Sequence, residues 1–367
     1  MVKIPVGVLG ATGMVGQQYI ALLAEHPWFE VRYVAASPRS AGKKYKDLMA
    51  GRWQLLQTFA PAVGDLIVED ANDLSRAIAA ATAGRLAFVF SALEMEKDEI
   101  HALEDAYAGA GIPVISNASA NRWTSDVPVL IAEVNPHHTD IIPIQQKARG
   151  WDRGFIVVKP NCSIQSYVTP VYALIKAGYE VKRLFVTTLE AVSGAGYPGV
   201  SSLDILDNVV PYIGGEEEKS ELEPLKVLGS IAGGVIQNAA EPKITAHCNR
   251  VPVVNGHTAC ISLEFGAKKP AIEEVKQIWT NFSGLPQELD LPMAPKRPII
   301  LREEANRPQP RKDRDTDKAM AVTVGRIRPC NLFDIRFVGL SHNTIRGAAG
   351  GGILNAELLK AKGYLGS

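Results

Sequence analysis

The stretch Gly10-Ala11-Thr12-Gly13-Met14-Val15-Gly16 decides the fold, because it joins two segments with different periodicities. The apolar run 6–9 before it predicts a buried strand, and apolar residues at helical spacing after it predict a helix. Gly10 allows a sharp turn, Gly13 lets backbone approach a pyrophosphate, and Gly16 permits close helix packing. The N–H groups that open the helix add a partial positive charge. The turn therefore predicts a dinucleotide site, with a tight structural turn as the alternative.

Outward from this turn, apolar runs and amphipathic segments alternate through the first part of the chain. Such alternation is typical of a parallel sheet with helices on both of its faces. The predicted strands are 31–36, 86–91 and 112–116, and the predicted helices are 73–83 and 97–108.

The second part of the chain, beyond about residue 157, has a different texture. Long β-like stretches predict an α+β domain with a mixed or antiparallel sheet, and they cover 184–192, 244–254, 258–265 and 321–328. The segment 307–318 is rich in charge and proline, and it is expected to be a solvated loop. The fold class is therefore α/β, with a Rossmann-type dinucleotide-binding domain joined to an α+β domain.

The end of the second predicted strand bears on the choice of cofactor. Folds that prefer NAD place Asp or Glu there to bind the ribose 2′-OH. This chain has Ala36-Ser37-Pro38-Arg39-Ser40, without a carboxylate, and Ser37, Arg39 and Ser40 can bind a 2′-phosphate. The sequence favours NADP, and the alternative is that Arg39 is only a solvated loop residue.

Composition excludes several classes of partner. The 367 residues include 39 Lys+Arg and 39 Asp+Glu, so the formal charge is zero and neither nucleic acid nor a membrane surface is an expected partner. No apolar run reaches the ~18 residues that cross a bilayer.

The four cysteines lie too far apart for a CxxC pair, so neither a disulfide scaffold nor a metal site is indicated. Three of them are expected to be small buried residues in a reducing, cytoplasmic compartment.

The fourth cysteine, Cys162, precedes the segment 164–175, whose apolar positions fit a helix. At a helix N-terminus the partial positive charge stabilises a thiolate. With a pKa of about 8.5 a thiol is about 3% ionised at pH 7, and a fall to about 7 would ionise half of it. We expect Cys162 to be a nucleophile with a lowered pKa, and a buried packing residue is the alternative.

A possible partner for this thiol follows Asn255-Gly256, a strong signal for a hairpin between two strands. In such a hairpin Arg250 and His257 share one face, with backbones about 13 Å apart along the ladder. A small carboxylate substrate fits between a guanidinium and an imidazole at that spacing. A lone His257 would more often be structural, and Pro252, which cannot donate to a ladder, argues against the hairpin.

Taken together, these residues resemble the aspartate-semialdehyde dehydrogenase family, above all its archaeal and fungal branch. The resemblance covers nearly the whole chain. It is carried by the glycine turn 10–16 and by 37–45, 116–119, 161–163, 192–197, 206–208, 216–219, Arg250 with His257, 307–311 and 343–351.

The resemblance implies reversible reduction of L-4-aspartyl phosphate by NADPH to L-aspartate 4-semialdehyde and inorganic phosphate, a step toward lysine, threonine and methionine. It makes Cys162 the nucleophile that forms a thioester, and His257 the acid/base group. Arg250 then binds the substrate carboxylate and Glu216 faces its amino group. The resemblance also implies that Arg122, Asn161 and Lys219 bind the phosphate. Cofactor contacts fall to Gly10, Thr12, Gly13, Met14, Val15, Ser37, Arg39, Ser40, Ser91, Ala92, Ser193, Gly194 and Asn343.

The family pattern also bears on domains and assembly. The glycine-rich tail resembles the family segment that returns to the cofactor domain. Residues 1–157 and 341–367 are therefore expected to form the NADP-binding domain, and 158–340 the catalytic and oligomerisation domain of a homodimer or homotetramer. Without the family, the charged run 216–219 would read as a solvated helix face.

One residue departs from the family, since Glu190 stands where most relatives have Gln. An amide can donate to a bound acyl group, whereas an ionised carboxylate only accepts and repels an anionic substrate. Either Glu190 is held protonated, or activity is lowered, or the substrate differs.

Three other functions are weighed against this one. Reductases of N-acetylglutamyl phosphate and of malonyl-CoA share the thioester chemistry, but Asn161, Glu216 and Arg250 favour a free amino acid. A non-catalytic dinucleotide-binding redox sensor would oxidise Cys162, yet it would not need charged residues aimed at a substrate.

Overall fold

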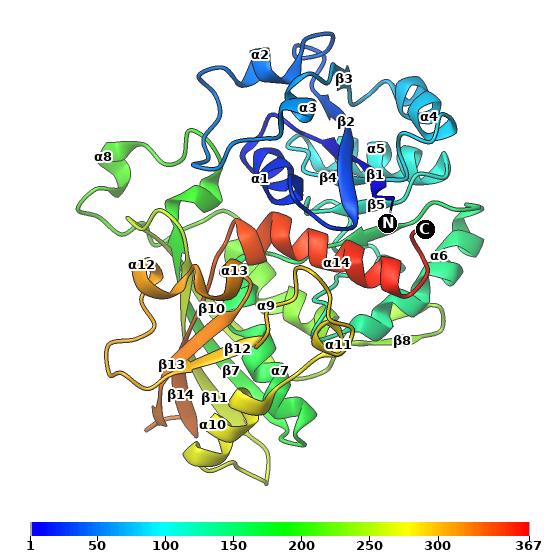
Figure 1. Cartoon of the computed structure of the whole chain (residues 1–367). Coiled ribbons are helices and arrows are strands. Elements are labelled where there is room, and N and C mark those ends of the chain that lie inside the picture. Colours follow the sequence, from blue (N-terminus) through cyan, green and yellow to red (C-terminus); the bar gives the residue numbers. More distant parts are fainter. Residues whose placement is uncertain (1, 367) are drawn as a thin grey trace.

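The computed structural model describes residues 2–366, which form two six-stranded sheets with helices around them (Figure 1). The first part of the chain contains β1 (Ile4–Leu9), α1 (Met14–Leu23), β2 (Phe29–Ala36), α2 (Tyr45–Met49), α3 (Pro61–Gly64), β3 (Val68–Asp70), α4 (Leu74–Thr82), β4 (Phe88–Ser91), α5 (Lys97–Gly109), β5 (Val114–Ser116), α6 (Ile142–Arg149) and β6 (Ile156–Val158). Each predicted strand and helix of this part is present, with ends that move by a few residues.

The remaining elements follow Cys162. They are α7 (Val168–Lys176), β7 (Val181–Ala191), α8 (Ser202–Ile205), α9 (Glu216–Val227), β8 (Ser230–Ala232), β9 (Val235–Gln237), β10 (Lys243–Val251), β11 (His257–Phe265), α10 (Ile272–Asn281), α11 (Leu285–Glu288), β12 (Ile299–Arg302), α12 (Pro310–Asp313), α13 (Thr316–Ala319), β13 (Val322–Pro329), β14 (Ile335–Ser341) and α14 (Gly350–Ala361).

The first sheet is parallel and has the strand order β3-β2-β1-β4-β5-β6. One apolar core joins it to α1 and α14, and a second core joins its other face to α4 and α5. The strand order reverses between β1 and β4, and ligands of such sheets bind at the carboxyl ends of the strands near this reversal. The predicted Rossmann-type sheet, covered on both faces, is confirmed.

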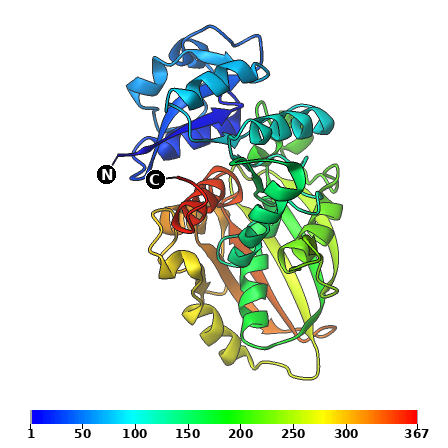
Figure 2. The same cartoon turned by 90° about the vertical axis from the view of Figure 1, so that its right-hand side faces the viewer.

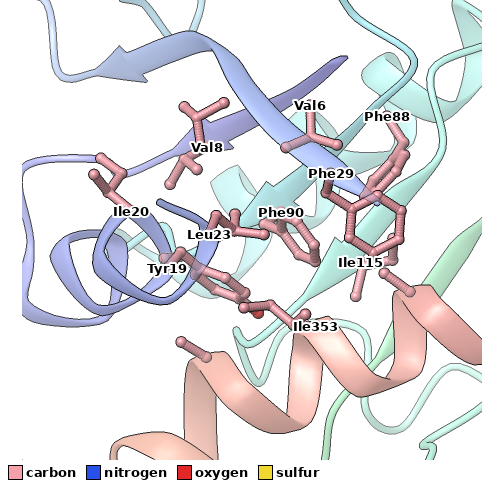
Figure 3. Close-up of a cluster of buried hydrophobic side chains, with 14 of the residues drawn as sticks. Val6, Val8, Tyr19, Ile20, Leu23, Phe29, Phe88, Phe90, Ile115 and Ile353 are labelled. Atoms are coloured by element: carbon pink, nitrogen blue, oxygen red, sulfur yellow. The ribbon is translucent and has the colours of Figure 1, made fainter. Parts of the chain in front are cut away.

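Helix α14, at the end of the chain, lies between the two sheets in both views (Figures 1 and 2). Its Ile353 points toward Tyr19 and Phe90 of the first core (Figure 3). Glycines allow this close approach, because a Cβ atom on Gly352 would overlap the Tyr19 hydroxyl. The permissive backbone of the tail therefore serves packing between distant parts of the chain.

The second sheet is mixed, as predicted, with the order β10-β7-β11-β14-β13-β12. The predicted hairpin at Asn255-Gly256 is wrong, because β7 lies between β10 and β11, parallel to the first and antiparallel to the second. The segment after Pro252 instead continues along the end of β7, where Val192 N–H donates to the Val253 carbonyl. A local turn signal cannot reveal a third strand inserted from elsewhere in the sequence.

Two smaller expectations are also wrong. Segment 307–318 is not a solvated loop, since it forms α12 and α13 and buries Asp313, which pairs with Arg302 and Arg307. Of the three cysteines expected to be buried, only Cys248 is buried, while Cys260 is exposed and Cys330 is half-buried.

Between residues 2 and 366, no helix is both long and apolar enough to cross a membrane.

Candidate active site

Two neighbouring cavities open where the strands of the first sheet end. We call the first the cofactor cleft; its volume is about 220 Å³. The second, the cysteine cavity, has a volume of about 150 Å³ and contains Cys162. Glu94 lines both cavities, and each also contacts the glycine turn, the first at Gly10, Thr12 and Gly13 and the second at Met14 and Val15.

The glycine turn is built as its sequence predicts. Gly10 has a φ of +72°, and a Cβ atom there would overlap the Ala92 carbonyl. Gly13 caps α1 without a side-chain bond, and the first turn of α1 has no acidic residue. The opening N–H groups of the helix are therefore available to an anion at the floor of the cofactor cleft.

Ten of the predicted cofactor contacts line these cavities. Those in the cofactor cleft are Gly10, Thr12, Gly13, Ser37 and Ala92, and those in the cysteine cavity are Met14, Val15, Ser193, Gly194 and Asn343. The other three do not. Ser40 and Ser91 are buried and line neither cavity, and Arg39 is exposed on the turn after Ser37.

Cys162 sits at the start of a single 3₁₀ turn, Ser163–Ser166, and α7 begins only after Tyr167. Its Sγ atom lies 3.3 Å from Nε2 of His257 and 3.5 Å from Oδ1 of Asn161, which also accepts the Cys162 backbone N–H at 2.8 Å. The predicted pairing of thiol and imidazole is thus present in the geometry, although the uninterrupted helix is not.

The expected lowering of the Cys162 pKa is wrong. Burial, with the carboxylates of Glu216 and Glu190, raises the pKa of this thiol to about 12. Lys159 opposes the rise, yet burial lowers the pKa of Lys159 itself to about 7. One 3₁₀ turn does not offset these effects, so the free site holds a neutral thiol.

His257 is fully buried, and its surroundings fix its tautomer. The backbone N–H of Ala191 donates to Nδ1 at 3.0 Å, so the ring proton of the neutral imidazole is on Nε2, facing Sγ. Burial, together with Arg250, lowers the pKa of His257 to about 3. His257 is therefore a neutral hydrogen-bond donor toward the sulfur.

Glu190 on β7 lies between Arg250 on β10 and His257 on β11, and we call these three residues on adjacent strands the Arg250–Glu190–His257 rung. Glu190 is the register partner of Arg250, and its Oε2 atom lies 3.7 Å from both Arg250 Nη1 and His257 Nε2. Burial and the nearby Glu216 raise the pKa of Glu190 to about 7, against the effect of Arg250. Arg250 and His257 thus meet across Glu190 and not along a hairpin ladder.

The predicted phosphate and amino-group ligands form a paired network beside the cysteine cavity. Glu216 is buried and accepts bonds from Asn161 Nδ2 at 2.6 Å and from Lys219 at 2.7 Å. Arg122 lines the cavity and pairs with Glu223 at 2.8 Å. The run 216–219 is therefore not merely a solvated helix face.

Two further residues at this site received no role in the sequence analysis. Glu223 is buried and also accepts the backbone N–H of Asn161 at 2.5 Å, so it ties Arg122 to the segment that holds Cys162. Asn117 lines the cysteine cavity with an unpaired amide. Asn117 directly follows the predicted strand 112–116, and this position at the carboxyl end of a parallel strand could have indicated a residue of the site. In the described chain no group of three or more His, Cys, Asp or Glu is arranged to hold a metal ion.

Comparison with known families identifies the class of protein. Residues 5–142 match the family model "Semialdehyde dehydrogenase, NAD binding domain", and residues 171–346 match "Semialdehyde dehydrogenase, dimerisation domain". A dinucleotide fold with a cysteine–histidine pair in a cavity beside its cofactor cleft is what such a dehydrogenase requires.

Individual relatives narrow this class. The chain is 48% identical to aspartate-semialdehyde dehydrogenase from Methanothermobacter thermautotrophicus, over 96% of this chain and 98% of the relative. It is 44% identical to the Candida albicans enzyme of the same name, over 98% of each. A crystal structure of that Candida albicans enzyme with NADP matches with a TM-score of 0.87 and 42% identity, over 99% of this chain and 100% of the other. The chain belongs to the aspartate-semialdehyde dehydrogenase family.

Proposed function

We propose that the protein catalyses the reversible, NADP-dependent conversion of L-4-aspartyl phosphate into L-aspartate 4-semialdehyde and inorganic phosphate, in the route to lysine, threonine and methionine. The observation that carries the proposal is the 3.3 Å contact of Cys162 with His257, in a cavity that also contacts the dinucleotide turn. Relatives that bear this activity in their name align with nearly the whole chain.

The cofactor cleft fits NADP. The uncapped N-terminus of α1 suits the pyrophosphate, and Ser37 lines the cleft beside the exposed Arg39. Within residues 2–366 no salt-bridge partner occupies Arg39, so its guanidinium is available to a 2′-phosphate. When bound as NADPH, the cofactor supplies a hydride to the acyl carbon.

The chain's own residues account for the remaining steps. The sulfur of Cys162 bonds to the acyl carbon, the carbon–oxygen bond to phosphate breaks, and the thiol proton leaves with the phosphate as HPO₄²⁻. After the acyl carbon is reduced, its oxygen carries negative charge, and His257 Nε2–H donates to that oxygen. The oxygen then re-forms the carbonyl, the carbon–sulfur bond breaks, and the thiolate leaves beside the same N–H group. It takes up one proton from solvent, which restores the neutral thiol and balances the proton lost with the phosphate.

Further assignments rest on the family and on charge. We assign the substrate carboxylate to Arg250. Its Nη1 atom donates to the Ala191 carbonyl at 2.8 Å, and its other N–H groups remain available to the substrate. We assign the substrate amino group to Glu216. We assign the phosphate to Arg122 and Lys219. Asn161, predicted as a third phosphate ligand, uses both ends of its amide within the chain, so we assign it instead to positioning Cys162.

Domain organisation and assembly belong to the same proposal. We assign residues 1–157 and 341–367 to an NADP-binding domain, and 158–340 to a catalytic and oligomerisation domain of a homodimer or homotetramer. The match of 171–346 to a dimerisation domain supports this. Four free cysteines suit a reducing compartment, and we propose the cytoplasm.

The test is the reduction of NADP with L-aspartate 4-semialdehyde, with and without inorganic phosphate. We expect turnover to require phosphate, because only phosphate releases the acyl group from Cys162 as an acyl phosphate. Succinate semialdehyde, and malonyl-CoA assayed in the direction of reduction, serve as comparisons and should react far more slowly. Turnover without phosphate would refute the acyl-phosphate assignment.

A further inference from the structure

Lys226 is a buried cation to which the proposed reaction gives no role. It lies in the last turn of α9, and its side chain is almost fully shielded from solvent. Its Nζ atom donates to the Arg122 carbonyl at 2.8 Å and to the Thr124 carbonyl at 2.7 Å. Burying an ammonium group is costly even when it is hydrogen-bonded. A lysine at this position is therefore expected to do more than fill space.

The position of Lys226 on α9 connects it to the cysteine cavity. Four polar side chains of this helix are spaced three or four residues apart and share one face, and they are Glu216, Ser220, Glu223 and Lys226. The first two contact Asn161 and Ser163, on either side of Cys162. The third contacts both this segment and the Arg122 guanidinium, and Lys226 contacts the Arg122 backbone. One helix face thus holds Arg122 in a fixed place relative to the nucleophile.

We propose that Lys226 is a positioning residue for phosphate, which holds Arg122 so that its guanidinium faces the phosphate beside Cys162. The guanidinium donates from Nη1 to Glu223 and from Nη2 to the Asn117 carbonyl. Each of these nitrogens has a second N–H group, and Arg122 lines the cysteine cavity, so an anion there still finds donors. The inference rests on the proposed function, because it takes phosphate as the ligand of Arg122.

The charge of Lys226 contributes together with its two hydrogen bonds. Glu223 lies one turn before Lys226 on α9 and attracts this ammonium group as well as the Arg122 guanidinium. Burial lowers the pKa of Lys226 to about 8, so most of the side chain is charged at pH 7. Without this charge Arg122 and Glu223 would form a neutral pair, and an incoming phosphate would meet one positive charge fewer.

The test is the affinity for inorganic phosphate, which needs no turnover. It is measured from the rise in melting temperature as phosphate is added in the presence of NADP at constant ionic strength. We expect Lys226→Met, which keeps the length but loses the charge and the donors, to bind phosphate about tenfold more weakly. NADP affinity should stay within about twofold. Lys147→Met, at an exposed position on α6, is the matched control and should behave as the native protein does.

A double substitution shows whether Lys226 acts through Arg122. Arg122→Ala removes the phosphate ligand itself, so adding Lys226→Met to it should cost at most about a further twofold, whereas independent effects would add in full. Full additivity would overturn the inference, and so would native phosphate affinity in Lys226→Met with only a lowered melting temperature. Lys226→Gln, which keeps a donor without the charge, should lose less phosphate affinity, and it replaces Lys226→Met in both comparisons if that variant does not fold.

The same titration separates this inference from the proposed function. Native protein that binds phosphate but reduces NADP without it would refute the acyl-phosphate assignment, and the comparison of variants would still decide the role of Lys226. Native protein that does not bind phosphate would overturn both.

Discussion

Glu190 and Arg250 face each other in the parallel register of β7 and β10, with 3.7 Å between Oε2 and Nη1. The pair lies among groups of both signs: His257 on β11, Glu216 and Lys219 on α9, and the Cys162 thiol. Burial and Glu216 raise the pKa of Glu190 to about 7, so its charge changes within the working range of the enzyme. In its protonated form it can donate a hydrogen bond as an amide does.

This relationship predicts a pH-dependent gain from Glu190→Gln. Because the folded pKa is raised, the protonated form dominates below about pH 7 and is lost as pH rises through that value. We expect kcat/KM of the variant to match the native enzyme near pH 6, to be about twice as high at pH 7 and about tenfold higher at pH 8. Glu218→Gln, an exposed neighbour on α9, is the control. A uniform loss across this range would show that the carboxylate is required.

The raised pKa of Cys162 predicts slow alkylation in the free enzyme. With the pKa at about 12, the thiolate fraction is small at pH 7 and rises tenfold per pH unit through pH 10. Iodoacetamide labelling resolved by peptide mass spectrometry measures this, with the exposed Cys260 as internal reference. Half-maximal labelling of Cys162 near pH 7 would instead support activation by the helix N-terminus.

Replacement of Cys162 tests whether this residue is needed for the reaction or only for the structure of the site. Cys162→Ser should reduce turnover by at least about a thousandfold, since a serine beside a neutral imidazole donor is a poor nucleophile. NADP affinity should stay within about twofold, because the glycine turn is untouched. Loss of both would indicate that the cysteine is structural.

Arg39 should control the choice between the two nicotinamide cofactors. Arg39→Ala removes a charged donor available to the 2′-phosphate, and we expect NADP to bind about ten- to a hundredfold more weakly while NAD changes little. Titration of both cofactors against the purified variant decides this. Equal weakening of the two would place Arg39 at a part of the dinucleotide that they share.

Helix α14 offers a stability test. In Gly352→Ala the added methyl group meets the buried Tyr19 side chain, and such overpacking costs about 1–3 kcal/mol. Gly366→Ala, which has open space around its Cβ position, should be neutral. Tyr19→Phe in the Gly352→Ala background removes the overlapping oxygen and should restore part of the lost melting temperature. A native melting temperature for Gly352→Ala alone would contradict the tight packing.

The features that were best predicted from the sequence are those that depend only on residues close together along the chain. The turn at Gly10 needs only its own φ angle and the strand and helix on either side, and the parallel sheet follows from alternation. The Arg250–Glu190–His257 rung could not be predicted, because it depends on the insertion of β7 between two strands that adjoin in sequence. The direction of the Cys162 pKa shift failed for a related reason, since burial and the approach of Glu216 arise only when distant segments pack together.

The position of α14 has a consequence for the order in which the protein can fold. The core beneath the first sheet contains Val6 and Val8 from the start of the chain and Ile353, Leu358 and Leu359 from its end. During synthesis the early strands leave the ribosome long before the residues of α14 do. One apolar face of the early strands therefore stays uncovered until α14 has been synthesised, and the dinucleotide-binding part of the chain cannot complete its native packing before then.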